Sequence, residues 1–530
     1  MKTGTTFTLF LTAILTLAAG SVFGAYSGGT GDPCTPYQIA TKTDLLALAA
    51  NTADYGKCFI LTADINMGGQ VFTTAIIAPD TVAGNYSFEG TAFTGTFDGN
   101  GHKITNFTIN GGHNCHLGLF GYISSGGSVK NLGLENFTVS GSSNSQYVAG
   151  LVGLSSGSIS NCYSTGAVSG GSNSFSVGGL VGGNSGGISD CYSTGAVSGY
   201  ADFGGLVGYN YSNSSINDCY STGDVNGGDS SYDIGGLVGG NNGSISTCYS
   251  TGDINGGDSS YDIGGLVGGN SSSGSISTCY STGAVSGVSN SYYVGCLVGY
   301  NSGGISNCYS TGAVSGVSNS YYVGCLVGYN SGGISNCYST GTVSGSEDVG
   351  GLVGGNYGTI SSCYSTGAVG GSTKVGGLVG WTGGSVSNCY STGTVNGSAI
   401  VGGLLGENYK GKIIRCYSTG RPAGSSNVGG LCGYKVTGGD YEDTGNFWDI
   451  QTSGCAISAG GTGKTTAEMK MLSTFTSAGW DFVNLWGIGN GQTYPYLKPL
   501  TGVNPADLNY SGKVDFDDFA IFADNWLTQW

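Results

Sequence analysis

The pentapeptide Cys-Tyr-Ser-Thr-Gly occurs ten times between residues 162 and 420, with its cysteines 26 to 31 residues apart. A unit of this length is too short to bury an apolar face alone, so stacking of successive units is the arrangement that creates a core. Residues 281–309 and 310–338 are identical, as expected of a recent duplication. The ten cysteines are Cys162, Cys191, Cys219, Cys248, Cys279, Cys308, Cys337, Cys363, Cys389 and Cys416.

Each unit reads as a set of short strands. A stretch of the type VGGLVGGN (177–184) leads through a Gly/Ser turn into ISDCYSTGAVSG (188–199). Runs of Val, Ile, Tyr and Thr bounded by Gly, Asn and Ser are strand signals, and no unit has a useful helical period. The pattern predicts an all-β fold, a parallel, right-handed β-helix or β-solenoid in which each residue lies about 4.8 Å from its copy in the next coil.

Strand alternation assigns the two faces of the repeated motif. Cys162, Ser164 and Val168 share one face, and Tyr163 lies on the other. We expect the small, soft cysteines to form a buried ladder of free thiols, because directly stacked parallel residues fit disulfide geometry poorly. The tyrosines then form an outward stripe, which either stabilises the stack or offers a platform to sugars.

Charge and the first residues set the compartment. The net charge of −16 argues against nucleic acid and anionic membrane surfaces as partners. Residues 1–24 have Lys2, an apolar run from about Phe7 to Ala19 and small residues after it, as in a secretory signal peptide. We expect a mature chain from Ala25 that is secreted or held at the cell surface and does not span a membrane.

Residues 25–140 are predicted to form an N-terminal cap and the first rungs. Leu45 and Leu48 belong to a short amphipathic helix pattern, and residues 95–109 resemble an early rung. Cys34 and Cys58 flank this helix, lie outside the ladder and are predicted to form a disulfide.

The repeat array is assigned to residues 141–435 and a closing segment to residues 436–500. The glycine-rich stretch 460–465 does not qualify as a phosphate loop, because Ser458 stands where that motif needs glycine and no βαβ unit leads into it.

The combination of GGLVGxN, a glycine turn and IxxCYSTGxVxG resembles the GLUG-motif repeat of bacterial extracellular proteins over about residues 150–433. The resemblance implies a surface adhesin or fibrous scaffold. The motif also accompanies some IgA-specific peptidases, where it is not the catalytic part. No protease chemistry carries over, since HExxH is absent and the histidines are His102, His113 and His116.

Residues 501–530 form a tail that fits the EF-hand calcium pattern, with Gly512 at the sharp turn. The segment resembles one half of a type I dockerin, which implies a short α-segment, bound Ca²⁺ and a cohesin-like docking partner. Ser511 departs from the usual aspartate, and a second calcium repeat is missing. The predicted calcium ligands are Asp507, Asn509, Ser511, Lys513 through its carbonyl, Asp515 and Asp518.

Two further groups of residues offer metal chemistry. The duplicated segments STGDVNGGDSSYDIGG and STGDINGGDSSYDIGG align three pairs of aspartates, which are either solvated loop residues or a calcium site. His113, Cys115 and His116 form a second, smaller candidate for a metal. The aligned pairs are Asp224 with Asp253, Asp229 with Asp258, and Asp233 with Asp262.

The sequence predicts a noncatalytic adhesin or scaffold with no catalytic residues. Its repeated surface would bind or space an extracellular polysaccharide or surface protein by many equivalent contacts, and its tail would dock through calcium. The alternative is a carbohydrate-active β-helix enzyme, a polysaccharide lyase or glycoside hydrolase, which would need one unique cluster of acidic and basic groups.

Overall fold

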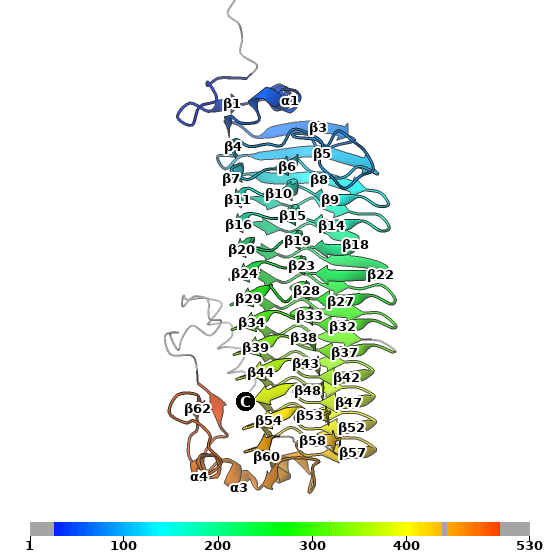
Figure 1. Ribbon diagram of the computed structural model, residues 1–530, viewed down its shortest axis with the longest axis vertical. Coiled ribbons are helices and arrows are strands. Elements are labelled where there is room, and N and C mark those ends of the chain that lie inside the picture. Colours follow the sequence, from blue (N-terminus) through cyan, green and yellow to red (C-terminus); the bar gives the residue numbers. More distant parts are fainter. Residues whose placement is uncertain (1–25, 317–318, 437–441, 499–530) are drawn as a thin grey trace, which may run out of the picture.

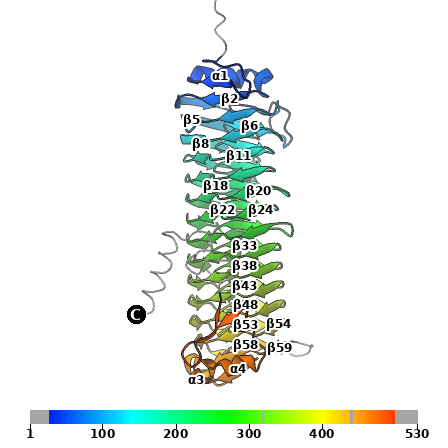
Figure 2. The same ribbon diagram turned by 90° about the vertical axis from the view of Figure 1, so that its left-hand side faces the viewer.

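The computed structural model describes residues 26–498, except residues 317–318 and 437–441. Over this part the chain winds into a long parallel β-solenoid, which confirms the predicted fold class. The coils stack along the long axis in Figure 1, and Figure 2 shows the stack from the side. The predicted tail, residues 501–530, and the predicted signal peptide, residues 1–24, lie outside the described residues.

Each coil supplies strands to three parallel sheets, and the repeats pair in register, as in Tyr249 with Tyr280. Counted over the described residues, the sheets have 12, 15 and 34 strands. The 12-stranded sheet contains β6 (Phe120–Ile123), β10 (Val152–Ser155), β15 (Val181–Asn184), β19 (Val207–Asn210), β23 (Val238–Asn241), β28 (Val267–Asn270), β33 (Val298–Asn301), β38 (Val327–Asn330), β43 (Val353–Asn356), β48 (Val379–Thr382), β53 (Leu405–Asn408) and β58 (Cys432–Lys435).

The 15-stranded sheet contains β1 (Tyr37–Ile39), β2 (Cys58–Leu61), β4 (Thr96–Asp98), β7 (Ser128–Lys130), β11 (Ser158–Ser160), β16 (Gly187–Ser189), β20 (Ser215–Asn217), β24 (Ser244–Ser246), β29 (Ser275–Ser277), β34 (Gly304–Ser306), β39 (Gly333–Ser335), β44 (Thr359–Ser361), β49 (Ser385–Ser387), β54 (Lys412–Ile414) and β59 (Asp443–Thr444).

The third sheet contains β3 (Ile65–Phe72), β5 (Lys103–Gly112), β8 (Gly133–Gly141), β9 (Gln146–Ala149), β12 (Tyr163–Ser164), β13 (Ala167–Ser169), β14 (Phe175–Gly178), β17 (Tyr192–Ser193), β18 (Val197–Gly204), β21 (Tyr220–Ser221), β22 (Val225–Gly235), β25 (Tyr249–Ser250), β26 (Ile254–Asn255), β27 (Tyr261–Gly264), β30 (Tyr280–Ser281), β31 (Val285–Gly287), β32 (Tyr292–Gly295), β35 (Tyr309–Ser310), β36 (Val314–Gly316), β37 (Tyr321–Gly324), β40 (Tyr338–Ser339), β41 (Val343–Ser344), β42 (Glu347–Gly350), β45 (Tyr364–Ser365), β46 (Val369–Gly370), β47 (Thr373–Gly376), β50 (Tyr390–Ser391), β51 (Val395–Asn396), β52 (Ala399–Gly402), β55 (Tyr417–Ser418), β56 (Pro422–Ala423), β57 (Ser426–Gly429), β60 (Phe447–Asp449) and β61 (Thr462–Lys464).

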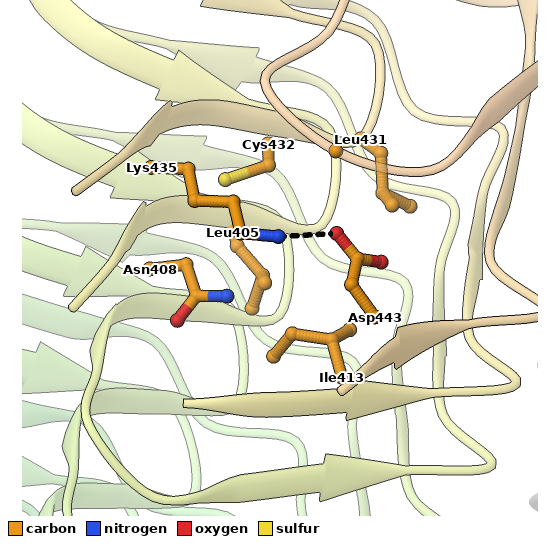
Figure 3. Close-up of a pocket in the computed structure, with 8 residues that line it drawn as sticks. Leu405, Asn408, Ile413, Leu431, Cys432, Lys435 and Asp443 are labelled. Atoms are coloured by element: carbon orange, nitrogen blue, oxygen red, sulfur yellow. Dashed lines mark hydrogen bonds and ion pairs between the residues drawn. The ribbon is translucent and has the colours of Figure 1, made fainter. Parts of the chain in front are cut away.

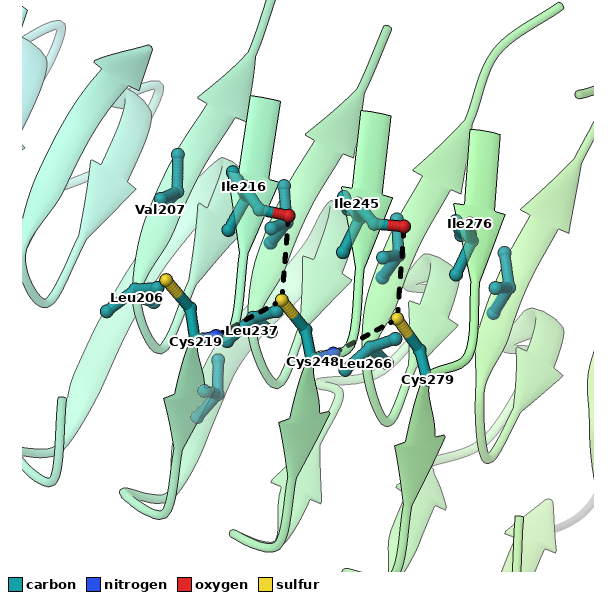
Figure 4. Packing of buried hydrophobic residues seen from close by; sticks show 14 of the residues in the cluster. Leu206, Val207, Ile216, Cys219, Leu237, Ile245, Cys248, Leu266, Ile276 and Cys279 are labelled. Atoms are coloured by element: carbon teal, nitrogen blue, oxygen red, sulfur yellow. Dashed lines mark hydrogen bonds between the residues drawn. The ribbon is translucent and has the colours of Figure 1, made fainter. Parts of the chain in front are cut away.

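The ten repeated cysteines lie inside the solenoid and are at most 1% exposed. None of them is in a disulfide here, and their burial and stacking confirm the predicted inner position of the ladder. Figure 4 shows Cys219, Cys248 and Cys279 side by side at the same position of successive coils. From Cys162 to Cys363, each cysteine N–H donates to the Sγ of the next ladder cysteine at 3.3 to 3.4 Å. The thiol satisfies a buried amide of the neighbouring coil, so each unit needs one cysteine and no disulfide partner.

A second internal ladder consists of the asparagines that end strands of the 12-stranded sheet. The Nδ2 of Asn241 donates to the Oδ1 of Asn270 at 2.8 Å, and the Nδ2 of Asn270 donates to the Oδ1 of Asn301 at 2.7 Å. The chain of amides runs from Asn184 to Asn356, where the Oγ1 of Thr382 accepts at 3.1 Å. These buried polar side chains are satisfied by their own copies, so they fix the register between coils.

The N-terminal end is covered by α1 (Lys42–Ala50), followed by the 3₁₀ helix η1 (Thr52–Asp54). Thr41 and Asp44 form a capping box at the start of α1, and Leu45 and Leu48 of this helix are fully buried. The predicted amphipathic helix is therefore present, and Figure 1 shows it lying over β3. Strands β4 and β5 form the early rung expected from residues 95–109.

Cys34 and Cys58 lie in this end of the solenoid. The Cys58 N–H donates to the Gly31 carbonyl at 2.9 Å, which places it beside the turn that carries Cys34. The structure has both as free thiols, Cys34 exposed and Cys58 half-buried. It therefore does not show the expected disulfide, which stays a prediction.

The closing segment contains α2 (Ile450–Ser453), α3 (Thr466–Met469), α4 (Leu472–Thr476) and the hairpin of β62 (Trp486–Gly487) and β63 (Tyr496–Leu497). It builds a small core of its own on the last coils, and the Tyr417 hydroxyl donates to the Pro495 carbonyl at 2.6 Å. The members of that core are Tyr417, Phe447, Met469, Phe475, Trp480 and Trp486.

Candidate functional site

The ten motif tyrosines stack along the 34-stranded sheet on the face opposite the cysteines, as the alternation predicted; eight are half-buried, whereas Tyr309 and Tyr417 are buried. Neighbouring ring centroids lie 4.9 to 5.1 Å apart, with interplanar angles of 1° to 11°. Within the stack, each ring covers a face of its neighbour, so sugar rings cannot lie against those faces. Offset-stacked pairs contribute about 0.5–1.5 kcal/mol each, which makes the stripe a stabilising device.

A second aromatic surface lies on the 12-stranded sheet, and we call it the ridge. Its rings are tilted or offset, with Tyr357 and Trp381 crossing at 61° and 4.7 Å between centroids. Tyr357 is 55% exposed and Tyr409 is 40% exposed, so ring faces reach solvent. The ridge consists of Tyr300, Tyr329, Tyr357, Trp381 and Tyr409.

Beside this sheet runs a column of residues with left-handed backbone, one for each coil. Each side chain extends over the next coil, where little space is left: a Cβ at Gly269 would lie 2.1 Å from the Asp233 Oδ1, and one at Gly240 would lie 2.9 Å from the Asp202 Oδ1. The aspartate side chains therefore take up part of the room that a side chain at either glycine would need. The column is Tyr147, Ser176, Asp202, Asp233, Asp262, Tyr293, Tyr322, Asp348, Lys374, Ile400 and Asn427.

Two aspartates of this column, Asp233 and Asp262, line a hollow of roughly 240 Å³, which we call the acidic slot, and Asp202 lies one coil before Asp233. Tyr209 and Tyr300 stand at its two ends, three coils apart, or about 14 Å at the usual strand spacing. Between them the missing side chains of two glycines leave the space open. The slot is defined by Tyr209, Asp233, Gly240, Asp262, Gly269 and Tyr300.

The slot carboxyls hold protons more strongly than ordinary aspartates. Burial raises the pKa of Asp202 to about 6 and the pKa of Asp262 to about 7. The pKa of Asp233 is raised well above its usual value by burial and by the neighbouring carboxyls of Asp262 and Asp202. Several tyrosine side chains also face this stack; they are Tyr147, Tyr209, Tyr211, Tyr232 and Tyr293.

No cation balances these three carboxyls among the described residues, whereas Asp348 of the same column has one. Lys374 Nζ lies 3.5 Å from Asp348 and 2.9 Å from Glu347. The Oδ1 atoms of Asp262 and Asp348 are both buried without a hydrogen-bond partner in the described part of the chain, but only Asp348 has an ion pair there. The slot therefore contains a buried carboxyl oxygen that no donor in the described residues satisfies.

The other aspartates of the duplicated segments lie apart from the slot. The Asp253 N–H donates to the Asp224 Oδ1, and the Asp258 N–H donates to the Asp229 Oδ1, both at 3.1 Å and both exposed. They fit the solvated-loop interpretation. The sequence pairs Asp233 with Asp262 through the duplicated motif. It does not point to Asp202 in the same way, because that coil lacks the motif. Asp202 does precede a Phe-Gly pair, as Asp233 and Asp262 precede Ile-Gly pairs, and this shared position is the signal that identifies it.

The predicted histidine and cysteine group is not brought together. His116 pairs with Asp80 at 3.2 Å, His113 faces the Ser143 carbonyl at 2.9 Å, and the Cys115 Sγ accepts the Gln146 N–H at 3.3 Å. Within the described residues no group of three or more His, Cys, Asp and Glu is arranged to hold a metal. The predicted calcium ligands Asp507, Asn509, Ser511, Lys513, Asp515 and Asp518 lie outside the described residues.

A small cavity at the C-terminal end of the core has a volume of about 10 Å³, enough for about one water molecule. Lys435 reaches across it to Asp443, with 2.9 Å between Nζ and Oδ2 (Figure 3). The ion pair closes the core against the closing segment, and the space is too small for a larger ligand.

Comparison with protein families identifies the GLUG motif in this chain, which agrees with the resemblance seen in the sequence. The motif matches seven segments, and together they cover part of the solenoid. They are residues 144–169, 173–198, 199–226, 230–255, 319–344, 345–370 and 371–396.

Two curated relatives share part of the array. Halomucin of Haloquadratum walsbyi is 31% identical over 158 residues, 28% of this chain and 2% of halomucin. A Gly-rich membrane protein of Evansella cellulosilytica is 31% identical over 144 residues, 26% of this chain and 15% of that protein. This chain thus spans a small fraction of both relatives. The repeat and the solenoid fit a surface repeat protein.

Among solved structures, a candidate immunoglobulin A1 protease from Bacteroides ovatus aligns over 90% of this chain and 96% of its own, at 18% identity. The TM-score of 0.27 is too low to support any conclusion about function. In the described part of the chain, none of the helices has the length and apolar character needed to cross a membrane.

Proposed function

We propose that this protein is a secreted or surface-attached, noncatalytic adhesin or scaffold that binds polysaccharide along the ridge. The ridge supports this proposal because it offers aromatic faces to solvent on several consecutive coils. Aromatic side chains combine a large apolar face with a polar tip, which suits sugar rings. Weak contacts repeated along one polymer add up by multivalency.

The proposal is tested by binding of the chain from Ala25 onward to a panel of neutral and acidic polysaccharides. The paired substitution Tyr357→Ala and Trp381→Ala should weaken polymer binding at least tenfold, since it removes the exposed centre of the ridge. Tyr261→Ala is the matched control, because Tyr261 is 43% exposed, is not part of the ridge and stacks on Tyr292. Equal binding by ridge and control variants would refute the role of the ridge.

A carbohydrate-active enzyme is the second candidate, favoured by Asp233 and Asp262. One coil separates them, and retaining glycosidases hold their two carboxyls about 5–5.5 Å apart. Such an enzyme also needs one ionised carboxylate, whereas the pKa values of both are raised. Release of reducing ends or unsaturated products, lost in Asp233→Asn, would establish this candidate in place of the adhesin.

The tail is assigned a docking role in the same proposal, with Ca²⁺ held by the loop that begins at Asp507. Calorimetry on the chain from Ala25 onward should show calcium binding that Asp507→Ala or Asp518→Ala removes, since a loop of anionic oxygens closes only around a cation. Unchanged calcium binding in both variants would refute this assignment.

A further inference from the structure

We propose that the acidic slot binds the protonated amino group of an amino sugar, with a sugar ring packed against Tyr209 or Tyr300 at an end of the slot. This inference rests on the proposed function and deepens it, because it names the class of sugar that one site on the array selects.

The charge of the slot calls for a cationic ligand. Asp233 and Asp262 line the hollow and Asp202 stands behind Asp233, with no Lys or Arg paired to any of them in the described residues. The Oδ1 of Asp262 is buried without a partner. An ammonium group has three donors and no acceptor, so it can satisfy several carboxyl oxygens at once.

The walls of the slot select an organic cation over a metal ion. Tyrosine faces attract ammonium groups, and they also pack against the apolar face of a sugar ring. A hard metal ion needs six or more oxygen ligands, and among the described residues no such group of acidic side chains is arranged around one point. The rings at both ends therefore favour a ligand that joins an ammonium group to a ring.

The shape of the slot is built into the fold. Gly240 and Gly269 lie at the floor, where the flanking coils have Tyr209 and Tyr300, and the left-handed backbone at Asp233 and Asp262 turns their side chains over this floor. Backbone positions with φ of 52° and 54° are readily taken by Asn as well as Asp. Asparagine substitutions therefore remove the charge without disturbing the coil.

The test is calorimetry at pH 7 with the chain from Ala25 onward and three probes: a glucosamine hexamer, an N-acetylglucosamine hexamer and a lysine hexapeptide. The glucosamine hexamer should bind at least tenfold more tightly than the other two. Because the slot carboxyls hold protons, binding should also release protons, seen as a heat that depends on the buffer. Equal affinity for the glucosamine and N-acetylglucosamine hexamers would overturn the proposal.

Two variants distinguish binding at the slot from a general effect of the protein's negative charge. Asp233→Asn with Asp262→Asn should lower glucosamine affinity about tenfold and abolish proton release. The matched control is Asp224→Asn with Asp253→Asn, which removes two exposed charges from the same coils and should change affinity less than twofold. An equal loss of glucosamine affinity in both variants would mean that net charge alone causes the binding, and it would overturn the proposal. If calcium displaces the hexamer from the parent chain but not from the slot variant, the slot binds a metal ion and the proposal is overturned.

Failure of the two proposals can be told apart. Glucosamine monomer binding compared with glucose tests the slot without any polymer, and the ridge variant Tyr357→Ala with Trp381→Ala leaves the slot intact. If neutral polysaccharide binds the ridge and the slot shows no preference for the amine, the inference fails and the proposed function stands. If no polysaccharide binds but the monomer does, the proposed function fails and the slot remains.

Discussion

The substitution Asn270→Ala tests whether the asparagine ladder holds the coils in register. Asn270 accepts from Asn241 and donates to Asn301, and all three side chains are buried. Alanine leaves one N–H of Asn241 and the Oδ1 of Asn301 without these partners. Each buried unsatisfied group costs about 1–3 kcal/mol, so the free energy of unfolding should fall by roughly 2–6 kcal/mol.

The matched control is Asn255→Ala. Asn255 donates to Asn226 at 3.1 Å in an exposed ladder of the same coils, so its loss should change the stability by less than about 0.5 kcal/mol. Urea unfolding followed by circular dichroism gives both values. Because a solenoid can open locally, hydrogen exchange of the amides near β28 and β33 should report the same loss. Stability of Asn270→Ala within 0.5 kcal/mol of the parent would refute the structural role of the ladder.

Three further outcomes follow from the fold. Thiol labelling of the denatured, unreduced chain should modify all ladder cysteines, with Cys34 and Cys58 protected if they are paired; peptides joining Cys308 to Cys337 would contradict the free-thiol ladder. Deletion of residues 281–309 should leave a folded chain shorter by one coil, about 4.8 Å, whereas deletion of half a unit should abolish cooperative unfolding. Since the pKa values of Asp202 and Asp262 lie at about 6 and about 7, above the usual 3.8, their contribution to stability is full below about pH 4 and is lost as the pH rises through 6 to 7. The variant with asparagine at residues 202, 233 and 262 should show a smaller loss between pH 4.5 and 8, and an unchanged loss would contradict this linkage.

The spacing of one pentapeptide was enough to predict the coil, its parallel pairing and the inner position of Cys162. Those features follow from stacking and strand alternation, which depend only on period and parity. The acidic slot depends instead on left-handed backbone at Asp202, Asp233 and Asp262, and this conformation is not visible in composition or periodicity.

The role of the aromatic residues could not be predicted from residue type alone. The tyrosine stripe and the ridge contain the same residue type, but the ring faces of Tyr249 are covered by its copies while those of Tyr357 reach solvent. The packing of the closing segment on Tyr417 was likewise hidden, because it joins residues far apart in the chain.

The two ladders have a genetic consequence. Any coil that brings a cysteine and an asparagine at the same positions can be paired with any other, since a thiol or amide of one copy satisfies the next equally well. Unequal recombination within the array can therefore lengthen or shorten the protein without exposing an unpaired group, and the identical stretches 281–309 and 310–338 show one such event. The acidic slot is different: its two tyrosines and two glycines belong to four specific coils, so an exchange inside residues 209–300 would destroy it. The number of coils after residue 300 can therefore change without affecting the slot, whereas the order of coils within residues 209–300 cannot.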